Sequence, residues 1–246
     1  MSRARVLGGD PTHPTRRTLL VDGLEASVVD LADPTHLEIP YVRRIAAILQ
    51  ATQPADVLHL GGGGCTLPRW LAATAPSGRV RSLVYEVDDE VVRVARAELG
   101  LDAVPGVRVE VGDARAGVAA QRPRSFDAVV TDVFVGPYVP KHVTTAQALR
   151  DLRRVLRPGG IYVANLIDEA PMRRVRRQLA TIAHELGEPT LIAERPVLRG
   201  RRAGNFIVAA GRTLPIARLR RAIPGVDILD GEAAVLWAEG AKVLVD

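Results

Sequence analysis

The sequence contains a single cysteine, Cys65, among its 246 residues. One cysteine cannot form a disulfide within the chain or a cysteine-rich zinc site, which excludes the disulfide-stabilised secreted class. Long apolar runs are also missing, since no stretch approaches the roughly 20 residues that a membrane-spanning helix needs. The arginines near the amino terminus are followed by only three apolar residues, 19–21, so they precede no hydrophobic signal core. We therefore expect a soluble, cytoplasmic protein with no membrane partner.

Lysine and aromatic side chains are also scarce. Only two of the 33 basic residues are lysines, Lys141 and Lys242, and aromatic residues make up 4% of the chain. The formal charge of +5 and the isoelectric point near 10.0 suit a nucleic-acid or acidic-membrane partner. However, 28 acidic residues are interspersed with the cations, which is typical of arginines on solvated surfaces. We therefore regard the charge as background and expect no nucleic-acid partner.

Apolar residues make up 47% of the chain, which is enough for a large buried core. Residues 1–16 have the composition of an irregular leader. Residues 18–31 predict a small β-hairpin, because short apolar runs flank the turn pair Asp22-Gly23. Residues 39–49 predict a helix with Pro40 in its first turn.

From residue 56 onward, apolar strand patterns alternate with amphipathic helix patterns. This alternation is typical of βαβ units and predicts an α/β fold with a doubly wound, mainly parallel, Rossmann-like sheet. We expect a leader, hairpin and helix at 1–50, a catalytic domain at 51–212 and an appendage at 213–246, which holds a basic helix and apolar stretches of undetermined structure. The expected strands are 56–60, 80–87, 107–111, 126–133, 161–167, 190–194 and 205–210, and the expected helices are 67–75, 89–99, 115–120, 144–156 and 171–186.

Four consecutive glycines, Gly61, Gly62, Gly63 and Gly64, separate the first of these strands from its helix. Glycine permits positive φ and lets a ligand approach the backbone beside a helix amino terminus. Because four glycines in a row cost folding entropy and add no packing, we interpret them as a ligand-binding turn. The turn lacks the lysine of a phosphate-binding P-loop, and Thr66 replaces the third glycine of a dinucleotide site.

Carboxylates stand at the ends of the next two strands. In such folds a carboxylate at about this distance after the glycine turn can bind both ribose hydroxyls, and Glu86 stands at that position. Asp113 either accepts a hydrogen bond from an adenine amino group or caps the next helix, and we interpret Asp88 as a helix cap. The glycine turn itself carries no cation. Together these features predict an adenosine bound without phosphate, and no metal ion.

Asp132 ends the fourth strand and precedes a proline-containing loop. The carboxyl ends of parallel strands are where ligands bind in this architecture. Asp132 is therefore predicted to be catalytic, by accepting a proton or orienting an attacking amine or hydroxyl. Phe134 and Tyr138 of the loop are predicted to line the substrate pocket. We interpret Cys65 as a packing residue, and the basic segment 195–202 as a loop for which contact with an acidic partner is an alternative.

The order of the motifs VLHLGGGGC, VYEVD, VGDAR, FDAVVTDVF and LRPGGIYVANL resembles the spermidine synthase (polyamine aminopropyltransferase) family. That family lies within the class I S-adenosylmethionine-dependent methyltransferase superfamily. The preceding stretch is similar to the family's amino-terminal β-hairpin, so the resemblance covers about residues 19–211. It implies a class I methyltransferase fold, a homodimer and a role in polyamine biosynthesis. It also implies a transferase that moves an aminopropyl group from its co-substrate, decarboxylated S-adenosylmethionine, to a polyamine amine.

The resemblance also implies roles for individual residues. It makes Gly61, Gly62 and Gly63 the donor-binding turn and Glu86 the ribose ligand. In the same way, Asp113 becomes the adenine contact and Asp132 the acid that helps to activate the acceptor amine. Tyr41 lies near the family's tyrosine-histidine signal, and we expect it in the substrate pocket.

Two aspartates of the family pattern are missing from this sequence. Gly64 replaces one in the glycine motif, and Val135 replaces one in the catalytic loop. Those carboxylates are the expected partners of the donor's aminopropyl ammonium and of the polyamine. Methyl transfer from S-adenosylmethionine to a small molecule therefore stays an alternative, and a non-catalytic nucleoside-binding or nucleic-acid-associated protein is a further one. His59 stands where methyltransferases commonly have an acid, and we interpret it as a core histidine.

Overall fold

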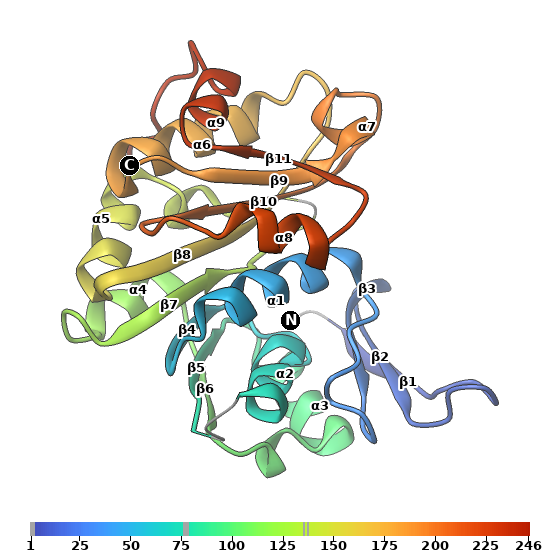
Figure 1. Cartoon of the computed structure of the whole chain (residues 1–246). Coiled ribbons are helices and arrows are strands. Elements are labelled where there is room, and N and C mark those ends of the chain that lie inside the picture. The colour runs from blue at the N-terminus through green and yellow to red at the C-terminus, as the bar shows by residue number, and fades with distance from the viewer. Residues whose placement is uncertain (1–2, 76–78, 135, 137) are drawn as a thin grey trace.

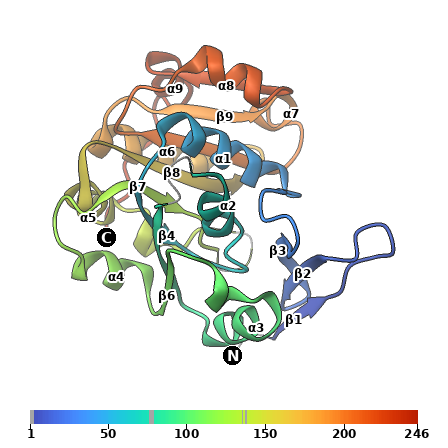
Figure 2. The same cartoon turned by 60° about the horizontal axis from the view of Figure 1, so that its bottom comes forward.

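The computed structural model describes residues 3–75, 79–134, 136 and 138–246. Its strands form two sheets, a small one of three strands at the amino terminus and a main one of eight strands (Figure 1). Helices cover both faces of the main sheet, and the small sheet lies beside the ends of its strands (Figures 1 and 2).

The small sheet contains the predicted hairpin and one additional strand. Strands β2 (Arg16–Val21) and β3 (Leu24–Asp30) are antiparallel and joined by Asp22 and Gly23, which both have positive φ. The expectation of an irregular leader holds for residues 8–15 but was wrong for β1 (Ala4–Leu7), which pairs with β2. In β1 only alternate side chains are half-buried, and this pattern is too short to identify a strand from the sequence.

The main sheet has the strand order β11-β9-β10-β8-β7-β4-β5-β6. Strands β4, β5, β6, β7 and β8 are mutually parallel, whereas β10 runs antiparallel to β8 and β9. The predicted α/β, mainly parallel and doubly wound sheet is therefore confirmed. The strands are β4 (Asp56–Leu60), β5 (Arg81–Glu86), β6 (Val107–Val111), β7 (Phe126–Thr131), β8 (Leu156–Asp168), β9 (Thr190–Glu194), β10 (Gly204–Ala210) and β11 (Val226–Asp230).

Alternate residues of the buried strands pack into different cores. Val130 and Val163 face one core with α1, α2 and α8, while Val129 and Tyr162 face another with α4, α5, α6 and α9. A third core joins α3 to the small sheet. The helices are α1 (Pro40–Thr52), α2 (Thr66–Thr74), α3 (Asp89–Leu99), α4 (Ala114–Ala120), α5 (Ala146–Val155), α6 (Arg173–Leu186), α7 (Arg195–Leu198), α8 (Ile216–Ala222) and α9 (Glu232–Trp237), with short 3-10 turns at Leu101–Ala103 and Lys141–Val143.

Several predicted boundaries differ from the observed ones. Strand β8 begins at Leu156, directly after α5, so Pro158, Gly159 and Gly160 lie within the strand and not in a separating turn. The pairing register of β7 with β8 shifts between Phe126 and Ala128, which accommodates this irregular start. Strand β7 ends at Thr131, so Asp132 lies just beyond the sheet.

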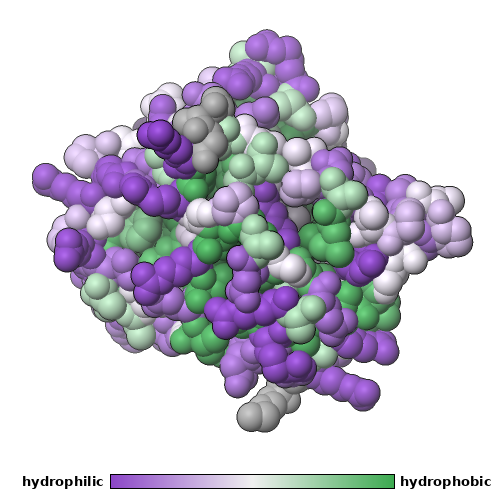
Figure 3. Space-filling view, turned by 90° about the horizontal axis from the view of Figure 1, so that it is seen from below, coloured by the Kyte–Doolittle hydropathy of each residue, from purple (hydrophilic) through white to green (hydrophobic). Residues whose placement is uncertain are grey.

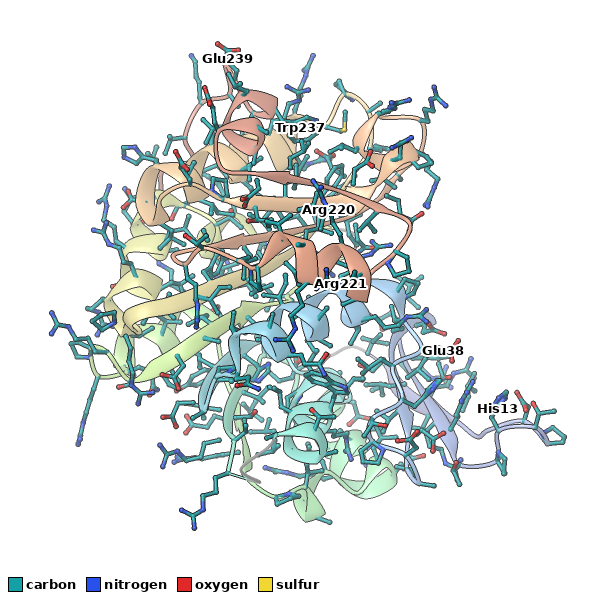
Figure 4. All side chains as sticks on the ribbon, in the orientation of Figure 1. His13, Glu38, Arg220, Arg221, Trp237 and Glu239 are labelled. Carbon is teal, nitrogen blue, oxygen red and sulfur yellow. The ribbon has the colours of Figure 1, made fainter. Side chains whose placement is uncertain are left out.

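The carboxyl-terminal segment extends the main sheet. The sequence did not predict β11, which pairs antiparallel with β9 at the sheet edge and is mostly half-buried. The basic helix after Pro215 is α8, which carries Arg220 and Arg221, and α9 ends at Trp237 (Figure 4). The Trp237 ring lies 5.8 Å from that of Phe206, measured between centroids. The domain division at residues 50 and 212 stays a prediction.

Within the described residues, no helix is both long and apolar enough to cross a membrane.

Candidate active site

The glycine turn follows β4 and lies directly against the backbone of Asp132. The Gly61 amide donates to the carbonyl oxygen of Tyr85 at 2.9 Å, and the Asp132 amide donates to the carbonyl oxygen of Leu60 at 2.8 Å. Gly61 has a φ of +87°, and a Cβ atom there would come within 2.2 Å of the Asp132 carbonyl oxygen. Glycine is therefore required at this position, and the close approach brings the predicted donor turn and the predicted catalytic residue together.

The Glu86 carboxylate bridges the glycine turn and the start of α3. Its Oε2 accepts from the amides of Gly62 and Gly63 at 3.0 Å each, and its Oε1 accepts from the Asp88 amide at 3.1 Å. Asp88 itself caps α3, as predicted, by accepting from the Glu90 amide at 3.0 Å. Glu86 is half-buried and lies beside the turn that the sequence assigns to the donor.

Asp113 caps α4 and also contacts a histidine that the sequence did not connect with it. Its Oδ1 accepts from the Ala116 amide at 2.9 Å, and its Oδ2 lies 2.8 Å from His142 Nε2. Burial acts to raise the pKa of Asp113, but the Ala116 amide and His142 outweigh it, so the pKa is lowered. The helix-capping interpretation is correct, while the adenine contact stays a prediction.

Asp132 lies at the junction of three elements. Its Oδ2 accepts from the Tyr41 hydroxyl of α1 at 3.1 Å, and its Oδ1 accepts from Asn165 Nδ2 of β8 at 2.9 Å. Burial raises the pKa of the Asp132 carboxyl group above its ordinary value, although both hydrogen bonds act in the opposite direction. Burial and the neighbouring Asp132 charge together raise the pKa of Tyr41 well above its ordinary value, so this phenol stays protonated.

A second asparagine supports the first. Asn165 is completely buried, and its Oδ1 accepts from Asn205 Nδ2 of β10 at 2.9 Å. Because an amide presents its oxygen and nitrogen on opposite sides, this contact turns the Asn165 NH₂ group toward Asp132. Sequence reasoning missed both asparagines. The only sequence signal was one asparagine in each of two mainly apolar stretches, residues 161–167 and 205–210.

The three predicted pocket residues have different surroundings. Tyr41 is joined to Asp132, as described above. Tyr138 lies under Arg174, whose guanidinium carbon is 3.7 Å from the ring centroid, and Phe134 is half-buried. Val135, which replaces a family aspartate, lies outside the described residues. Of these aromatic residues, the structure thus brings only Tyr41 into hydrogen-bonding contact with the predicted catalytic residue.

Strand β3 of the small sheet closes over the glycine turn. The Gly64 amide donates to Ser27 Oγ at 2.9 Å, and the Thr66 hydroxyl donates to the Val28 carbonyl oxygen at 3.2 Å. A Cβ atom on Gly64 would lie 3.0 Å from Ser27 Cβ and 3.2 Å from Val29 Cγ2. The space that the aspartate side chain of the family pattern would need is therefore filled by β3.

Two other residues near the turn are unsuited to catalysis. Cys65 is buried, and burial raises the pKa of its thiol to about 12. His59 is buried in β4 with Nε2 3.3 Å from Ser82 Oγ, and burial lowers the pKa of its imidazole to about 3. Both residues thus have the core roles predicted for them. In the described part of the chain, no group of three His, Cys, Asp or Glu side chains is placed to hold a metal ion.

Comparisons with known proteins show the fold. A family model described as a methyltransferase domain matches residues 57–160. The crystal structure of a probable spermidine synthase from Corynebacterium glutamicum superposes with a TM-score of 0.91 and 28% identity, covering 100% of this chain and 93% of that one. The chain is spermidine-synthase-like and has the methyltransferase fold.

Two further proteins are similar to this spermidine-synthase-like chain, one in sequence and one in fold. The polyamine aminopropyltransferase of Vibrio vulnificus is 30% identical over 148 residues, which are 58% of this chain and 49% of that protein. The chain thus spans about half the length of the curated aminopropyltransferases that it matches. The spermidine synthase of Thermotoga maritima shares the fold, with a TM-score of 0.62 and 17% identity over 89% of this chain and 72% of that one.

Proposed function

We propose that this protein transfers the aminopropyl group of decarboxylated S-adenosylmethionine to a small-molecule amine. The observation that carries this proposal is the position of Asp132. Its backbone touches the glycine turn at Gly61, while its carboxylate is held by Tyr41 and Asn165. A proton acceptor therefore lies directly beside the turn that we assign to the donor. The similarity to aminopropyltransferases and to a probable spermidine synthase supports the same reaction.

We assign donor binding to the ends of β4, β5 and β6. Glu86 Oε1 accepts from one backbone amide, so it retains a lone pair that would accept a hydrogen bond from a ribose hydroxyl. Asp113 would accept one from the adenine amino group. Val87 and Val111 are 70% and 52% exposed, and each directly follows or ends one of these strands. Exposed apolar side chains beside two carboxylates suit the faces of a purine ring. The face seen from below likewise mixes exposed apolar side chains with charged ones (Figure 3).

The transfer step is a single displacement. The acceptor nitrogen attacks the aminopropyl carbon that is bonded to the sulfonium, and a C–N bond forms as the C–S bond breaks. The sulfur keeps the electron pair of that bond and leaves as the thioether of methylthioadenosine, while the amine proton passes to Asp132. Because the sulfonium is already a good leaving group, the protein mainly needs to align the nucleophile and exclude water.

The surroundings of Asp132 suit a proton acceptor. Burial raises its pKa, which makes the carboxylate a stronger base than an ordinary surface aspartate. The Tyr41 hydroxyl and the Asn165 amide each donate to a different carboxylate oxygen, so they fix the orientation of the group. Each oxygen retains a lone pair that can face the amine.

Two alternatives are tested by the same experiment. Methyl transfer from intact S-adenosylmethionine would produce S-adenosylhomocysteine, whereas aminopropyl transfer produces methylthioadenosine. A non-catalytic nucleoside-binding protein would bind the donor and produce neither thioether. The aminopropyltransferase relatives favour aminopropyl transfer over both alternatives. A homodimer also remains part of the proposal.

The test combines donor binding with product analysis. The protein is incubated with each donor and a mixture of amines, and the thioether products are identified by mass spectrometry. We expect methylthioadenosine from the decarboxylated donor, and a thermal shift with that donor that Glu86→Gln abolishes and the α3 surface variant Glu98→Gln retains. S-adenosylhomocysteine as the main product would favour methyl transfer instead. Absence of a thermal shift with every adenosyl compound would overturn the donor assignment.

A further inference from the structure

Six arginines gather where β8 and β9 end, and we call this group the basic rim. Strand β10 begins at the same edge, since Gly204 pairs with Asp168, the last residue of β8. Helix α7 and the loop after it therefore lie at one end of the main-sheet strands. The small sheet and the amino-terminal end of α1 lie at the same end (Figure 1). The basic rim consists of Arg44, Arg173, Arg174, Arg199, Arg201 and Arg202.

Contacts join the basic rim to the surroundings of Asp132. Arg44 lies one helical turn after Tyr41 on α1, is buried, and donates to Glu194 Oε1 at 2.7 Å. Arg202 contacts the other oxygen of Glu194. The loop that carries Arg202 leads into Asn205, which orients the Asn165 amide toward Asp132. The rim is thus connected to Asp132 through both α1 and β10.

The other side of the rim adjoins the loop that follows Asp132. Arg174 stacks over the Tyr138 ring at 3.7 Å and lies 3.9 Å from an oxygen of Asp168. A Cβ atom on Gly200 would contact Met172 Cε at 3.2 Å, so the loop after α7 packs on the segment that leads into α6. The arginines of both segments therefore lie around one region of the surface.

Two carboxylates near the rim are already engaged, whereas that of Glu169, next to Asp168, is exposed. Glu194 lies between Arg44 and Arg202, and hydrogen bonding to Arg44 is the main cause that lowers its pKa. Asp168 accepts from the amides of Arg174 and Val175 at the start of α6 and from that of Glu169. Within the described part of the chain, the exposed side chains of Arg173, Arg199 and Arg201 form no ion pair with a carboxylate. These three guanidinium groups are available to an anion.

A rim of this charge disfavours a polyamine. A polyamine carries two or more ammonium groups, and only one of them reacts, so any other that reaches the rim meets guanidinium charge. The aspartates that the family pattern places at positions 64 and 135 are glycine and valine here. Guanidinium groups instead match carboxylate and phosphate oxygens, often through two parallel hydrogen bonds.

We propose that the basic rim selects an acceptor amine that also carries a carboxylate or phosphate group. This inference rests on the proposed function, because it concerns the acceptor of that same transfer. The amine would face Asp132, and the acidic group would bind Arg199 and Arg201. The bonds formed and broken remain those described above, since the acidic group takes no part in the displacement.

Acceptor binding is measured by calorimetry on the full chain saturated with methylthioadenosine, so that no turnover occurs. The probes are 4-aminobutyrate for a carboxylate, phosphoethanolamine for a phosphate, and putrescine and spermidine for polyamines. We expect at least one acidic amine to bind 10-fold or more tightly than either polyamine. The better of the two acidic probes identifies the preferred anion. Tighter binding of a polyamine than of both acidic amines, or no binding of any probe, would overturn the inference.

A pair of charge-reversal variants tests the rim itself. Arg199→Glu with Arg201→Glu is expected to weaken acidic-amine binding at least 10-fold and to strengthen putrescine binding. The matched control is Arg79→Glu with Arg122→Glu, which reverses two exposed arginines before β5 and β7, at the opposite end of the strands. The control is expected to leave both affinities unchanged. Equal effects of the two double variants, with both melting like the wild type, would also overturn the inference.

Product analysis separates this inference from the proposed function. If methylthioadenosine forms from the decarboxylated donor with putrescine but with neither acidic amine, the proposed function stands and the role of the rim is wrong. If it forms faster with an acidic amine, both stand. If no amine of either class yields methylthioadenosine, the proposed function fails, and the inference fails with it.

Discussion

Asp132 shows how a single side chain combines stability and chemistry. The fold places its carboxylate where burial raises the pKa, and two donors, Tyr41 and Asn165, hold it there. A raised pKa means that the folded protein binds this proton more tightly than the unfolded chain does. Stability is therefore lost as the pH rises from the ordinary value of 3.8 through the raised pKa, and the loss persists at neutral pH.

Asp132→Asn is expected to separate these two effects. Without a proton acceptor, the transfer rate should fall by roughly 10²- to 10⁴-fold, the usual contribution of general base catalysis. The melting temperature of the variant minus that of the wild type should increase as the pH is raised from 4 to 7. The reason is that the buried Asp132 carboxyl group ionises over this range and destabilises the wild type, whereas asparagine cannot ionise. Transfer assays and thermal melts across this range check both effects. An unchanged rate would contradict the catalytic role.

At the scale of elements, the contact between β3 and the glycine turn decides what position 64 can hold. The Gly64 amide is satisfied by Ser27 Oγ, and a Cβ atom there would also meet Leu99 Cδ1 at 3.3 Å. The turn follows from the glycine run, but the strand that covers it comes from a separate sheet. Packing of the small sheet against the glycine turn therefore fills the space that the family aspartate would need at position 64.

Gly64→Asp restores the family residue and is expected to destabilise the protein. Over-packing costs about 1–3 kcal/mol, and burying a carboxylate beside Val29 and Leu99 adds to that cost. Chemical denaturation measures the change in the free energy of unfolding. Gly8→Asp is the control, since a Cβ atom on Gly8 meets nothing within 4 Å. Wild-type stability together with tighter polyamine binding would show that β3 adapts to the new side chain.

At the scale of the whole molecule, the carboxyl-terminal segment completes the main sheet. Strand β11 covers the edge of β9, and residues of α8 and β11 pack into the core that contains α1. Leu214, Leu219, Ile223 and Ile228 are all buried. Burial of such side chains contributes about 1.5–3 kcal/mol each, so together they are comparable with the net stability of a typical domain, about 5–15 kcal/mol.

A chain that ends at Gly211 is therefore expected to lose cooperative unfolding. The truncation would expose the β9 edge and remove these four buried side chains. Circular dichroism during heating, beside the full chain, measures the effect. A cooperative transition within a few degrees of that of the full chain would instead show that residues 1–211 are stable without the appendage.

The sequence by itself determined seven of the eight strands of the main sheet, the glycine turn and the carboxylates at the strand ends. These features depend on local periodicity and on single residues such as Gly61, Glu86 and Asp132, which can be read within a short window. It also predicted the core roles of His59, which lies within an apolar strand, and of Cys65, for which the sequence shows no basic partner.

Only the tertiary structure decided which of these groups meet. Tyr41 and Asp132 are 91 residues apart, and Asn165 and Asn205 are 40 apart, yet the four side chains form one hydrogen-bonded group. The packing of β3 on Gly64 and the pairing of β11 with β9 are equally remote in sequence. The physical reason is that such contacts depend on which strands become neighbours. That order follows from the packing of the whole chain, and no local pattern specifies it.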